Sequence, residues 1–328
     1  MKILRVGDPH IKVSNLDESD RLMQFVLDQA NSLSVDTVEF LGDMADTHAI
    51  VRLEVLEFLD RWFRTFASQG FKTIVLVGNH DLTGSYSSKY SALTPFRNIL
   101  GNLKIIETPT LIGKIGYLPY IHDNEVFVSE ANNLAALGAK VLVSHTTYEG
   151  SAYDNGMYAP NGVNHEHIDL SVTNLVSGHI HSTQEFGRVQ YPGTARWATA
   201  SDANAEKGIY LYTHDEEGAI AARDFIDTKS VCTPIIGIER KESDTSPLSI
   251  PEGAEVYLSL IGTSAWIQSV KEELRGKKGL KISSKFTDTK RAATTRKSGK
   301  SLMEFVTSHY ETKKRDKLIS FMQELKIV

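Results

Sequence analysis

Five short polar segments each follow an apolar run of the strand type, and they hold most of the residues that could do chemistry. The segments are Asp8-Pro9-His10, Gly42–Asp46, Gly78–Asp81, His145 and Gly178–His181. In open α/β sheets, ligands collect beyond the carboxyl ends of the strands, so segments far apart in sequence can meet at one site. Residues i and i+2 of an extended segment point to the same side, which lets Asp8 and His10 face one centre. The same holds for His179 and His181. Carboxylate and imidazole groups gathered in this way are typical of a site for divalent cations.

Each of these segments is a weak signal when it is taken alone, because polar residues at strand ends are common as caps and turn formers. All five in this order, each at a strand end, are not expected by chance. Glycines precede Asp43, Asn79 and His179, and they allow tight turns that bring side chains close to a ligand. Two further histidines near a motif or a strand end, His48 and His122, are kept as weaker site candidates.

The five segments together resemble the signature of calcineurin-like metallophosphoesterases. The resemblance implies two cations that share the carboxylate of Asp43. The implied ligands are Asp8, His10, Asp43 and His181 for one cation, and Asp43, Asn79, His145 and His179 for the other. His80 would contact the scissile phosphate and protonate the leaving oxygen. Asp46 and Asp81 would assist the reaction by orienting their neighbours.

The implied chemistry follows from charge. Two divalent cations bring more positive charge than Asp8 and Asp43 offset, which leaves a pocket suited to a phosphodiester. A bound cation also makes water a better nucleophile, since a single zinc lowers its pKa to roughly 7. The ligands are oxygen and imidazole with no thiolate, so we expect two Mn²⁺, with Mg²⁺, Fe²⁺ and Zn²⁺ as alternatives.

Three further stretches resemble those of SbcD-type DNA nucleases. They are Gly178–Gln184, which reads Gly-His-Ile-His-Ser-Thr-Gln, then Tyr191-Pro192-Gly193-Thr194, and Lys207–Leu211. This resemblance implies metal-dependent exonuclease and endonuclease action on DNA within an SbcCD-type recombination and repair complex. It also implies a homodimer and an SbcC-type coiled-coil ATPase partner. Some relatives have histidine at the position of Asp46, which questions a second catalytic histidine here but not the activity.

Apolar runs of the strand type alternate with helical patterns, which predicts an α/β layered fold. The expected strands are Ile3–Val6, Val38–Leu41, Ile74–Val77, Val141–Val143 and Leu175–Val176, and the expected helices are Arg21–Leu33, Leu53–Phe66 and Leu93–Leu100. After Gln184 we expect a second sheet from strands near Phe186–Gln190, Gly208–Tyr212 and Ala219–Phe225. The family resemblance implies a four-layer α/β/β/α sandwich with a small capping domain and a helical tail.

The chain is expected to divide into four parts: a nuclease domain over 1–232, a small β-α-β capping domain over 233–286, a basic linker over 287–300, and a helical segment over 301–328 that binds the partner ATPase. Between Lys271 and Lys300, eleven basic residues and three acidic ones leave a net charge of +8, where a polyanion could be held. We therefore name Lys277 and Lys278 as candidate DNA-binding residues. Tyr148 is a candidate for stacking on a base, although ordinary loop packing is the simpler interpretation.

The composition is that of an ordinary globular protein, with 328 residues, 41% hydrophobic and 23% charged. A formal net charge of −5 argues against a uniformly basic surface. Cys232 stands alone, which excludes an internal disulfide and fits a reducing compartment. No apolar run approaches the roughly 18 residues of a membrane span, and the first residues lack the pattern of a signal peptide. We therefore expect a cytoplasmic protein with no membrane contact.

Two other functions fit parts of the sequence. A phosphodiesterase or phosphatase acting on a small nucleotide or other phosphoester would need the same five segments, but not the basic stretch from Lys271. A non-catalytic scaffold of the same fold would have lost ligand residues, whereas every ligand position here is filled. The sequence therefore favours a DNA nuclease over both.

Overall fold

The structure is a computed structural model, and it describes residues 1–46, 50–82, 90–153, 156–159 and 161–288. The described chain divides into two compact units. The first contains Met1–Ile238, Leu248–Leu258 and Lys278–Lys281. The second contains Glu239–Pro247, Ser259–Lys277 and the described residues from Ile282 onward.

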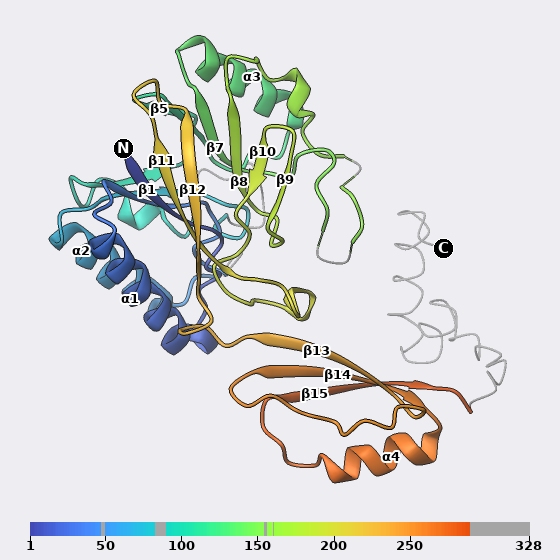
Figure 1. Ribbon diagram of the computed structural model, residues 1–328. Helices are drawn as coiled ribbons and strands as arrows, with labels where there is room; N and C mark the ends of the chain where they lie inside the picture. The colour runs from blue at the N-terminus through green and yellow to red at the C-terminus, as the bar shows by residue number, and fades with distance from the viewer. Residues whose placement is uncertain (47–49, 83–89, 154–155, 160, 289–328) are drawn as a thin grey trace, which may run out of the picture. The chain divides into compact units, whose positions relative to one another are not determined.

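Six strands form the first sheet of the larger unit, in the order β12-β11-β1-β2-β3-β4. Their bounds are β1 Lys2–Val6, β2 Thr37–Phe40, β3 Lys72–Leu76, β4 Leu103–Ile106, β11 Gly208–His214 and β12 Ile220–Asp227. Figure 1 labels β1, β11 and β12 of this sheet. The strands β1 to β4 run parallel, and β11 and β12 are antiparallel to their neighbours. All four residues of β2 are buried, as expected for a central parallel strand that is covered on both faces.

Two helices, α1 (Leu16–Ser32) and α2 (Leu53–Ser68), cover one face of this sheet. In α2 the buried residues recur at the three- and four-residue spacing of one helix face: Val55, Phe58, Leu59, Trp62, Phe63 and Phe66. Burying a side chain as large as Phe stabilises the fold by about 1.5–3 kcal/mol, so this stripe holds the helix on the sheet. The observed bounds of α2 extend the predicted helix by two residues.

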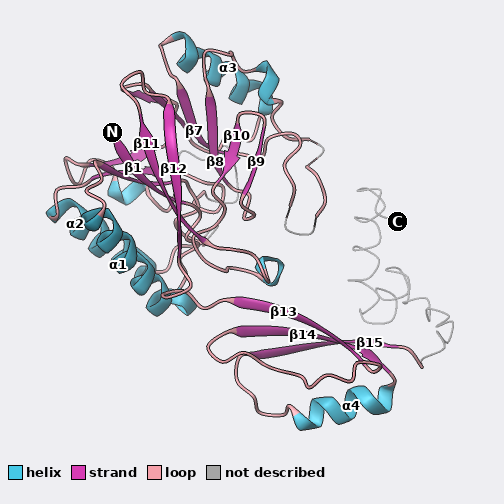
Figure 2. Ribbon diagram, viewed as in Figure 1, coloured by secondary structure: helices cyan, strands magenta, loops and turns pink. Residues whose placement is uncertain are grey.

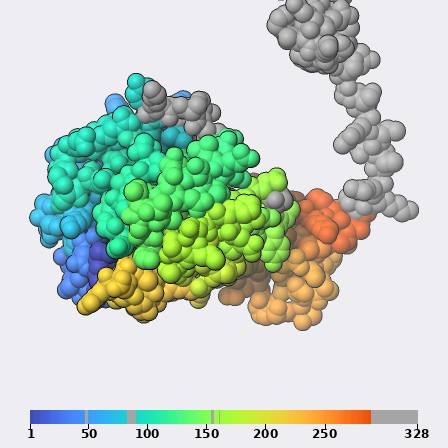
Figure 3. Space-filling view, turned by 90° about the horizontal axis from the view of Figure 1, so that it is seen from above, coloured from blue at the N-terminus to red at the C-terminus, as the bar shows by residue number. Residues whose placement is uncertain are grey.

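The second sheet has the order β5-β6-β7-β8-β10-β9. Its strands are β5 Thr110–Ile112, β6 Ile115–Leu118, β7 Val141–His145, β8 Asn174–Gly178, β9 Gln184–Phe186 and β10 Val189–Tyr191. Helix α3 (Asn124–Ala136) packs on its outer face through Phe127, Ala131 and Leu134, and it forms part of the surface drawn in green in Figure 3. Asp123 is the N-cap of this helix, and its carboxylate accepts the backbone N–H groups of Glu125 and Val126.

The two sheets face each other across a third apolar core, which contains Ile3, Leu41 and Ile74 from the first sheet side and Val143 and Val176 from the second. The order of layers is therefore two helices, sheet, sheet, helix, with the helices on opposite sides of the strands (Figure 2). The predicted four-layer α/β/β/α architecture is confirmed.

A buried polar cluster lies between the two sheets. Arg5 in β1 and Glu39 in β2 form an ion pair of 2.7 Å with both side chains fully buried. Tyr117 in β6 donates its hydroxyl to the other oxygen of Glu39, so this carboxylate also joins the second sheet to the first. The guanidinium of Arg5 lies 4.3 Å from the ring centre of Tyr212, which adds a cation–π contact.

Some predicted elements differ from the structure. The strand expected at Phe186–Gln190 is a hairpin, because Gly187 at φ 56° turns the chain between β9 and β10. The strands β11 and β12 join the first sheet through β1 and not the second. The helix expected at Leu93–Leu100 is reduced to one short 3-10 turn, since Pro95 lies in it and Asn98 has φ 56°. The elements that were not predicted are β4, β5, β6, α3 and β13.

A separate three-stranded sheet has the order β13-β14-β15. Its strands are β13 Ile235–Lys241, β14 Glu255–Gly262 and β15 Leu280–Phe286, and α4 (Ser264–Glu273) connects β14 to β15. The strand, helix and strand expected here are therefore present. The rest of the linker and the whole segment 301–328 lie outside the described residues, and the four-part division stays a prediction.

Four 3-10 helices complete the described secondary structure: η1 Val13–Asn15, η2 Thr94–Phe96, η3 His165–His167 and η4 Ala200–Asp202. Among the helices that are described, none is both long and apolar enough to cross a lipid bilayer.

Candidate metal centre

The five polar segments meet at the carboxyl ends of five strands in the larger unit. The segments follow β1, β2 and β3 of the first sheet and β7 and β8 of the second. Parallel strands within each sheet end at one edge. These edges of the two sheets meet at the site, since His179 after β8 donates its backbone N–H to Asp8 after β1, 171 residues away. The convergence predicted from the sequence is present.

One group of side chains consists of Asp8, His10 and His181, whose ligand atoms all lie within 4.8 Å of one another. The Nε2 atoms of His10 and His181 are 3.1 Å apart. A cation about 2.1 Å from each of two nitrogens at a right angle would separate them by roughly 3 Å, so the spacing fits. Asp8 Oδ2 accepts the backbone N–H of His179 at 2.7 Å, while Asp8 Oδ1 is buried with no hydrogen-bond partner in the described part of the chain.

A second group consists of Asp43, His145 and His179, again with ligand atoms within 4.8 Å of one another. Asp43 Oδ2 lies 3.3 Å from His145 Nε2. The side-chain oxygen of Asn79 lies 3.0 Å from the same nitrogen and 2.8 Å from His179 Nδ1. The Asn79 oxygen is therefore close enough to both imidazoles to serve as a fourth ligand if a cation binds there.

Asp43 lies between the two groups. Its Oδ2 atom is 3.3 Å from His145 in the second group and 4.0 Å from His10 Nε2 in the first. Its Oδ1 atom accepts the backbone N–H of His80 at 2.8 Å, which fixes the direction of the carboxylate. This is the position that a shared ligand would need.

His80 stands beside the two groups and keeps 28% of its side chain exposed. Its Nδ1 atom lies 2.9 Å from Asp46 Oδ1, and Lys12 donates to the other oxygen of Asp46 at 2.8 Å. Burial lowers the pKa of His80, but the hydrogen bond that His80 donates to Asp46 and the charge of Asp43 outweigh it, so the pKa lies above the usual value. Asp46 therefore orients a histidine that can hold and release a proton.

Asp81 has a different position from Asp46. It is fully buried and accepts the backbone N–H groups of Ala45 and Gly78 at 2.9 Å and of Met44 at 3.3 Å. Burial and the charge of Asp43 raise the pKa of Asp81 to about 7. Its carboxyl group ties the loop after β2 to the loop after β3, and these two loops carry Asp43 and Asn79.

The backbone at the site is strained. Asp8, His10, Asp43 and His179 have φ values of 33°, 48°, 48° and 82°. They make up four of the seven non-glycine residues with positive φ in the described ranges. Each such residue costs about 1–3 kcal/mol and persists only where its surroundings enforce it, which is typical of functional sites.

Two glycines give the carboxylates the space that they occupy. A Cβ atom on Gly78 would lie 2.2 Å from Asp43 Oδ1, and one on Gly178 would lie 2.5 Å from Asp8 Oδ1. Any larger residue would push the carboxylates away from the two groups. The close approach expected at these glycines is therefore present.

Burial and neighbouring charges shift the pKa values of the histidines and of Asp8 at the site. Burial opposes a charge on His145, but Asp43 and Asp8 raise the pKa of that histidine to about 9. Burial lowers the pKa values of His10 and His179 to about 3, so both imidazoles are neutral at pH 7, which is the form that binds a cation. Burial also raises the pKa of Asp8 to about 6.

Two site residues were not predicted. Asp202 is fully buried, and its Oδ1 atom lies 3.7 Å from His181 Nδ1. Lys207 is buried as well, and it donates to Asp202 and, at 2.8 Å, to the carbonyl oxygen of His181. Lys207 was noted only as part of a stretch similar to SbcD-type nucleases. Asp202 lies in a run of alanines and polar residues that carries no motif.

The three residues suggested for DNA contact have different outcomes. Tyr148 is fully buried, and its hydroxyl lies 3.2 Å from that of Ser144. Its ring packs against Phe127 and Tyr191, so it cannot stack on a base and the packing interpretation is correct. Lys277 and Lys278 are exposed in the turn after α4, and their role stays a prediction.

The two weaker histidine candidates also differ. His48 lies outside the described residues. His122 is exposed, with its Nδ1 atom 3.3 Å from the hydroxyl of Tyr120, and it belongs to neither ligand group.

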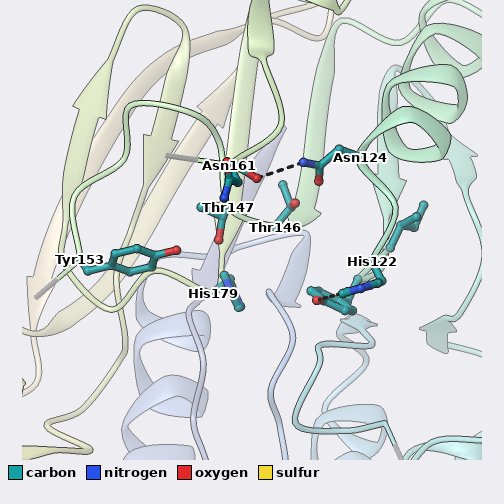
Figure 4. A pocket seen from close by; sticks show the side chains of 9 residues that line it. His122, Asn124, Thr146, Thr147, Tyr153, Asn161 and His179 are labelled. Carbon is teal, nitrogen blue, oxygen red and sulfur yellow. Dashed lines mark hydrogen bonds between the residues drawn. The ribbon is translucent and has the colours of Figure 1, made fainter. Parts of the chain in front are cut away.

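A cavity of about 270 Å³ opens beside His179 (Figure 4). Its lining combines aromatic rings with neutral hydrogen-bonding groups, and it consists of Tyr120, Ile121, His122, Asn124, Thr146, Thr147, Tyr153, Asn161 and His179. Asn124 donates to the carbonyl oxygen of Asn161 at 3.0 Å across one side. The ring of Tyr120 lies 6.0 Å from that of His179, so the cavity borders the second ligand group directly.

Comparison with known proteins supports a hydrolytic site. The sequence model of the calcineurin-like phosphoesterase family matches residues 1–183. The chain is 26% identical over 227 residues to exonuclease subunit 1 of Enterobacteria phage T4, covering 66% of each protein. It is 29% identical over 231 residues to a putative phosphoesterase of Invertebrate iridescent virus 6, covering 66% of this chain and 77% of the relative. A putative phosphoesterase of Invertebrate iridescent virus 3 is 26% identical over 210 residues, covering 60% of this chain and 57% of the relative.

Proposed function

On the premise that the chain belongs to the calcineurin-like phosphoesterase family and is a phosphoester hydrolase, we propose that it is a metal-dependent DNA nuclease. The observation that carries the proposal is the pair of ligand groups that meet at Asp43, together with the similarity to a phage exonuclease subunit. The proposed setting is an SbcCD-type recombination and repair complex in the cytoplasm of a bacterial cell or a phage-infected host.

The residues present fit two divalent cations. The first group would hold one cation through Asp8, His10 and His181, and the second would hold another through Asn79, His145 and His179, with Asp43 shared. The Oδ1 atom of Asp8 supports this assignment, because it is buried and accepts no hydrogen bond from the described residues, with only His145 Nδ1 at 3.6 Å to offset its charge. Bound cations would supply positive charge for the phosphate and a water that ionises near neutral pH. Mn²⁺ is the proposed metal because the donors are oxygen and imidazole.

His80 would serve the leaving group. Its Nδ1 atom faces Asp46, and the other ring nitrogen, Nε2, would carry the proton that passes to the departing oxygen. A pKa above the usual value increases the protonated fraction at neutral pH, which suits an acid. Lys12 holds Asp46 from the other side, so the histidine is oriented by a carboxylate that is itself fixed.

The cavity beside His179 supports a nucleotide substrate. It contains aromatic rings and neutral amide and hydroxyl groups but no lysine or arginine among its described lining residues. Such a lining suits the uncharged base and sugar of a nucleotide whose phosphate is held elsewhere. Tyr153 lines this cavity with 39% of its surface exposed, and in the proposal it would contact a base.

The partners belong to the proposal as well. We propose that the chain forms a homodimer and binds an SbcC-type ATPase through residues 301–328. Deleting these residues is expected to abolish capture of the ATPase while leaving cleavage of single-stranded DNA at the wild-type rate. Capture of the ATPase at full strength by the truncated chain would contradict this assignment.

The alternative is a phosphodiesterase or phosphatase for a small nucleotide or other phosphoester. The small volume of the cavity and the similarity to two viral putative phosphoesterases favour it. The basic residues from Lys271 onward, including Lys277 and Lys278, favour DNA, since a polyanion gains from many positive contacts and a small substrate does not.

One experiment separates the two functions. The purified full chain is incubated with labelled single- and double-stranded DNA and, in parallel, with cyclic nucleotides and nucleoside monophosphates. Each reaction is run with Mn²⁺ and with a chelator. The proposal expects Mn²⁺-dependent cleavage of DNA with little turnover of the small substrates. Efficient turnover of a small phosphoester with no cleavage of DNA would establish the alternative.

A further inference from the structure

The two ring nitrogens of His181 face different partners. Nε2 lies 3.1 Å from His10 Nε2, in the first ligand group, and Nδ1 lies 3.7 Å from Asp202 Oδ1. A neutral imidazole carries one N–H and one lone pair, and the N–H is favoured on the nitrogen that faces an acceptor. The carboxylate of Asp202 therefore leaves the lone pair of His181 on Nε2, where the cation position is proposed.

Asp202 is fixed independently of His181. Its Oδ2 atom accepts the backbone N–H groups of Ala198 at 2.9 Å and Thr199 at 2.8 Å. The residue ends the 3-10 helix η4 and is fully buried. These contacts hold the carboxylate in one orientation, with Oδ1 directed toward His181 and Lys207.

Lys207 contacts both Asp202 and His181. Its ammonium group is fully buried, and it donates to Asp202 Oδ1 and to the carbonyl oxygen of His181. It thus fixes the backbone of His181 as well as the carboxylate that faces the ring. It also neutralises a carboxylate that would otherwise be costly to bury.

His10 has no comparable support. Its Nδ1 atom is buried and has no hydrogen-bond partner within the part of the chain that the structure describes. Of the two histidines in the first group, His181 is therefore the one whose ring direction is fixed by side chains outside the group.

We infer that Asp202 and Lys207 are a positioning pair that sets the tautomer and direction of His181 and thereby the affinity of the first cation position. The inference rests on the metal assignment in the proposed function, and it adds two residues that belong to none of the five polar segments. Carboxylates behind a metal-binding histidine typically change metal affinity by about 10- to 100-fold when they are removed.

The test measures cation affinity directly. The full-length chain is stripped of metal and titrated calorimetrically with Mn²⁺. The Asp202→Asn variant is expected to bind Mn²⁺ about 10- to 100-fold more weakly at one of the two positions. The matched control is Glu39→Gln, which also removes a carboxylate from a fully buried ion pair, but whose partners are Arg5 and Tyr117 and none of the proposed ligands. The control is expected to bind Mn²⁺ like the wild type.

A second variant separates positioning from mere structural support. Asp202→Asn leaves the ammonium of Lys207 without its counter-ion, so the double variant Asp202→Asn with Lys207→Met removes that unpaired charge. The double variant is expected to regain the melting temperature while its Mn²⁺ affinity stays low. If Asp202→Asn alone fails to fold, the double variant decides the question in the same titration.

Two results would overturn the inference: Mn²⁺ affinity of Asp202→Asn within about threefold of the wild type, or recovery of affinity together with stability in the double variant. Because the readout is cation binding, a wild-type chain that binds Mn²⁺ but cleaves no DNA would refute the proposed function and not this inference.

Discussion

The molecule buries two clusters of charged side chains, and they differ in how their carboxylates are satisfied. Between the sheets, each oxygen of Glu39 has a donor within the protein, from Arg5 on one side and Tyr117 on the other. At the candidate metal centre, Asp8 Oδ1 is equally buried but has no donor among the described residues. Within the described ranges, the carboxylate of the first cluster is therefore satisfied by the protein, although Arg5 Nη1 has no hydrogen-bond partner, whereas one oxygen of Asp8 accepts no hydrogen bond.

The backbone shows the same difference. Arg5 and Glu39 lie inside regular strands, but Asp8, His10 and Asp43 all adopt positive φ values just beyond strand ends. Burying carboxylates and imidazoles does not require positive φ values, so this strain indicates a further constraint on the position of these side chains. Burial of charge alone therefore does not identify a site. This site is marked by a buried acceptor that lacks a hydrogen bond from the described part of the chain, together with positive φ values at non-glycine residues.

The largest expected effect is the loss of DNA cleavage when His80 is replaced, compared with replacement of a histidine outside the site. His80→Ala should lower the rate of DNA cleavage by about 10²- to 10⁴-fold, because a positioned general acid contributes that much. Mn²⁺ affinity should change little, since His80 is not a proposed ligand. The matched control is His167→Ala in the exposed 3-10 helix η3, which should cleave like the wild type. Wild-type cleavage rates in His80→Ala would remove His80 from the mechanism.

The next effect is a dependence of cation binding on pH. Asp43 and Asp8 raise the pKa of His145 to about 9 against the effect of burial, so the metal-free site holds a proton there at pH 7. A cation must displace that proton, and affinity for Mn²⁺ should therefore rise with pH by roughly tenfold per unit up to about pH 9. Calorimetric titration between pH 6.5 and 8.5, in steps of about half a unit, measures the slope. A flat profile would show that His145 loses no proton when the cation binds.

The smallest effect on the site is expected from the cluster between the sheets. Glu39→Gln removes one partner of a fully buried ion pair, and such changes cost about 3–5 kcal/mol of unfolding free energy. Denaturant unfolding of the metal-free chain should show this loss. Mn²⁺ affinity of the folded variant should match the wild type, because the two clusters share no partner. A parallel fall in affinity would mean that the clusters are coupled.

The convergence of the polar segments within each sheet could be predicted, because each segment follows a recognisable strand and parallel strands of one sheet end together. The meeting of the two sheets at one site depends in addition on the core packed between them, which strand patterns do not specify. The packing of α2 on the sheet could also be predicted from local features, since the apolar residues from Val55 to Phe66 recur at the spacing of one helix face.

Asp202 and the position of β11 could not be predicted, because each depends on contacts between distant segments. Asp202 lies near His181 through the short helix η4, which matches no motif. For Tyr148 the sequence favoured packing over base stacking, but its neighbours, Phe127 in α3 and Tyr191 in β10, could not be named from the sequence. The pairing of β11 with β1 joins residues more than 200 positions apart, and strand patterns do not specify partners.

The central claim is that Asp43 lies between two cations, and anomalous diffraction from crystals soaked in Mn²⁺ tests it most directly. Two anomalous peaks about 3.5–4 Å apart are expected. One should lie among Asp8, His10 and His181 and the other among Asn79, His145 and His179, with Asp43 in contact with both. Soaked crystals with no manganese peak between Asp43 and His179 would contradict it.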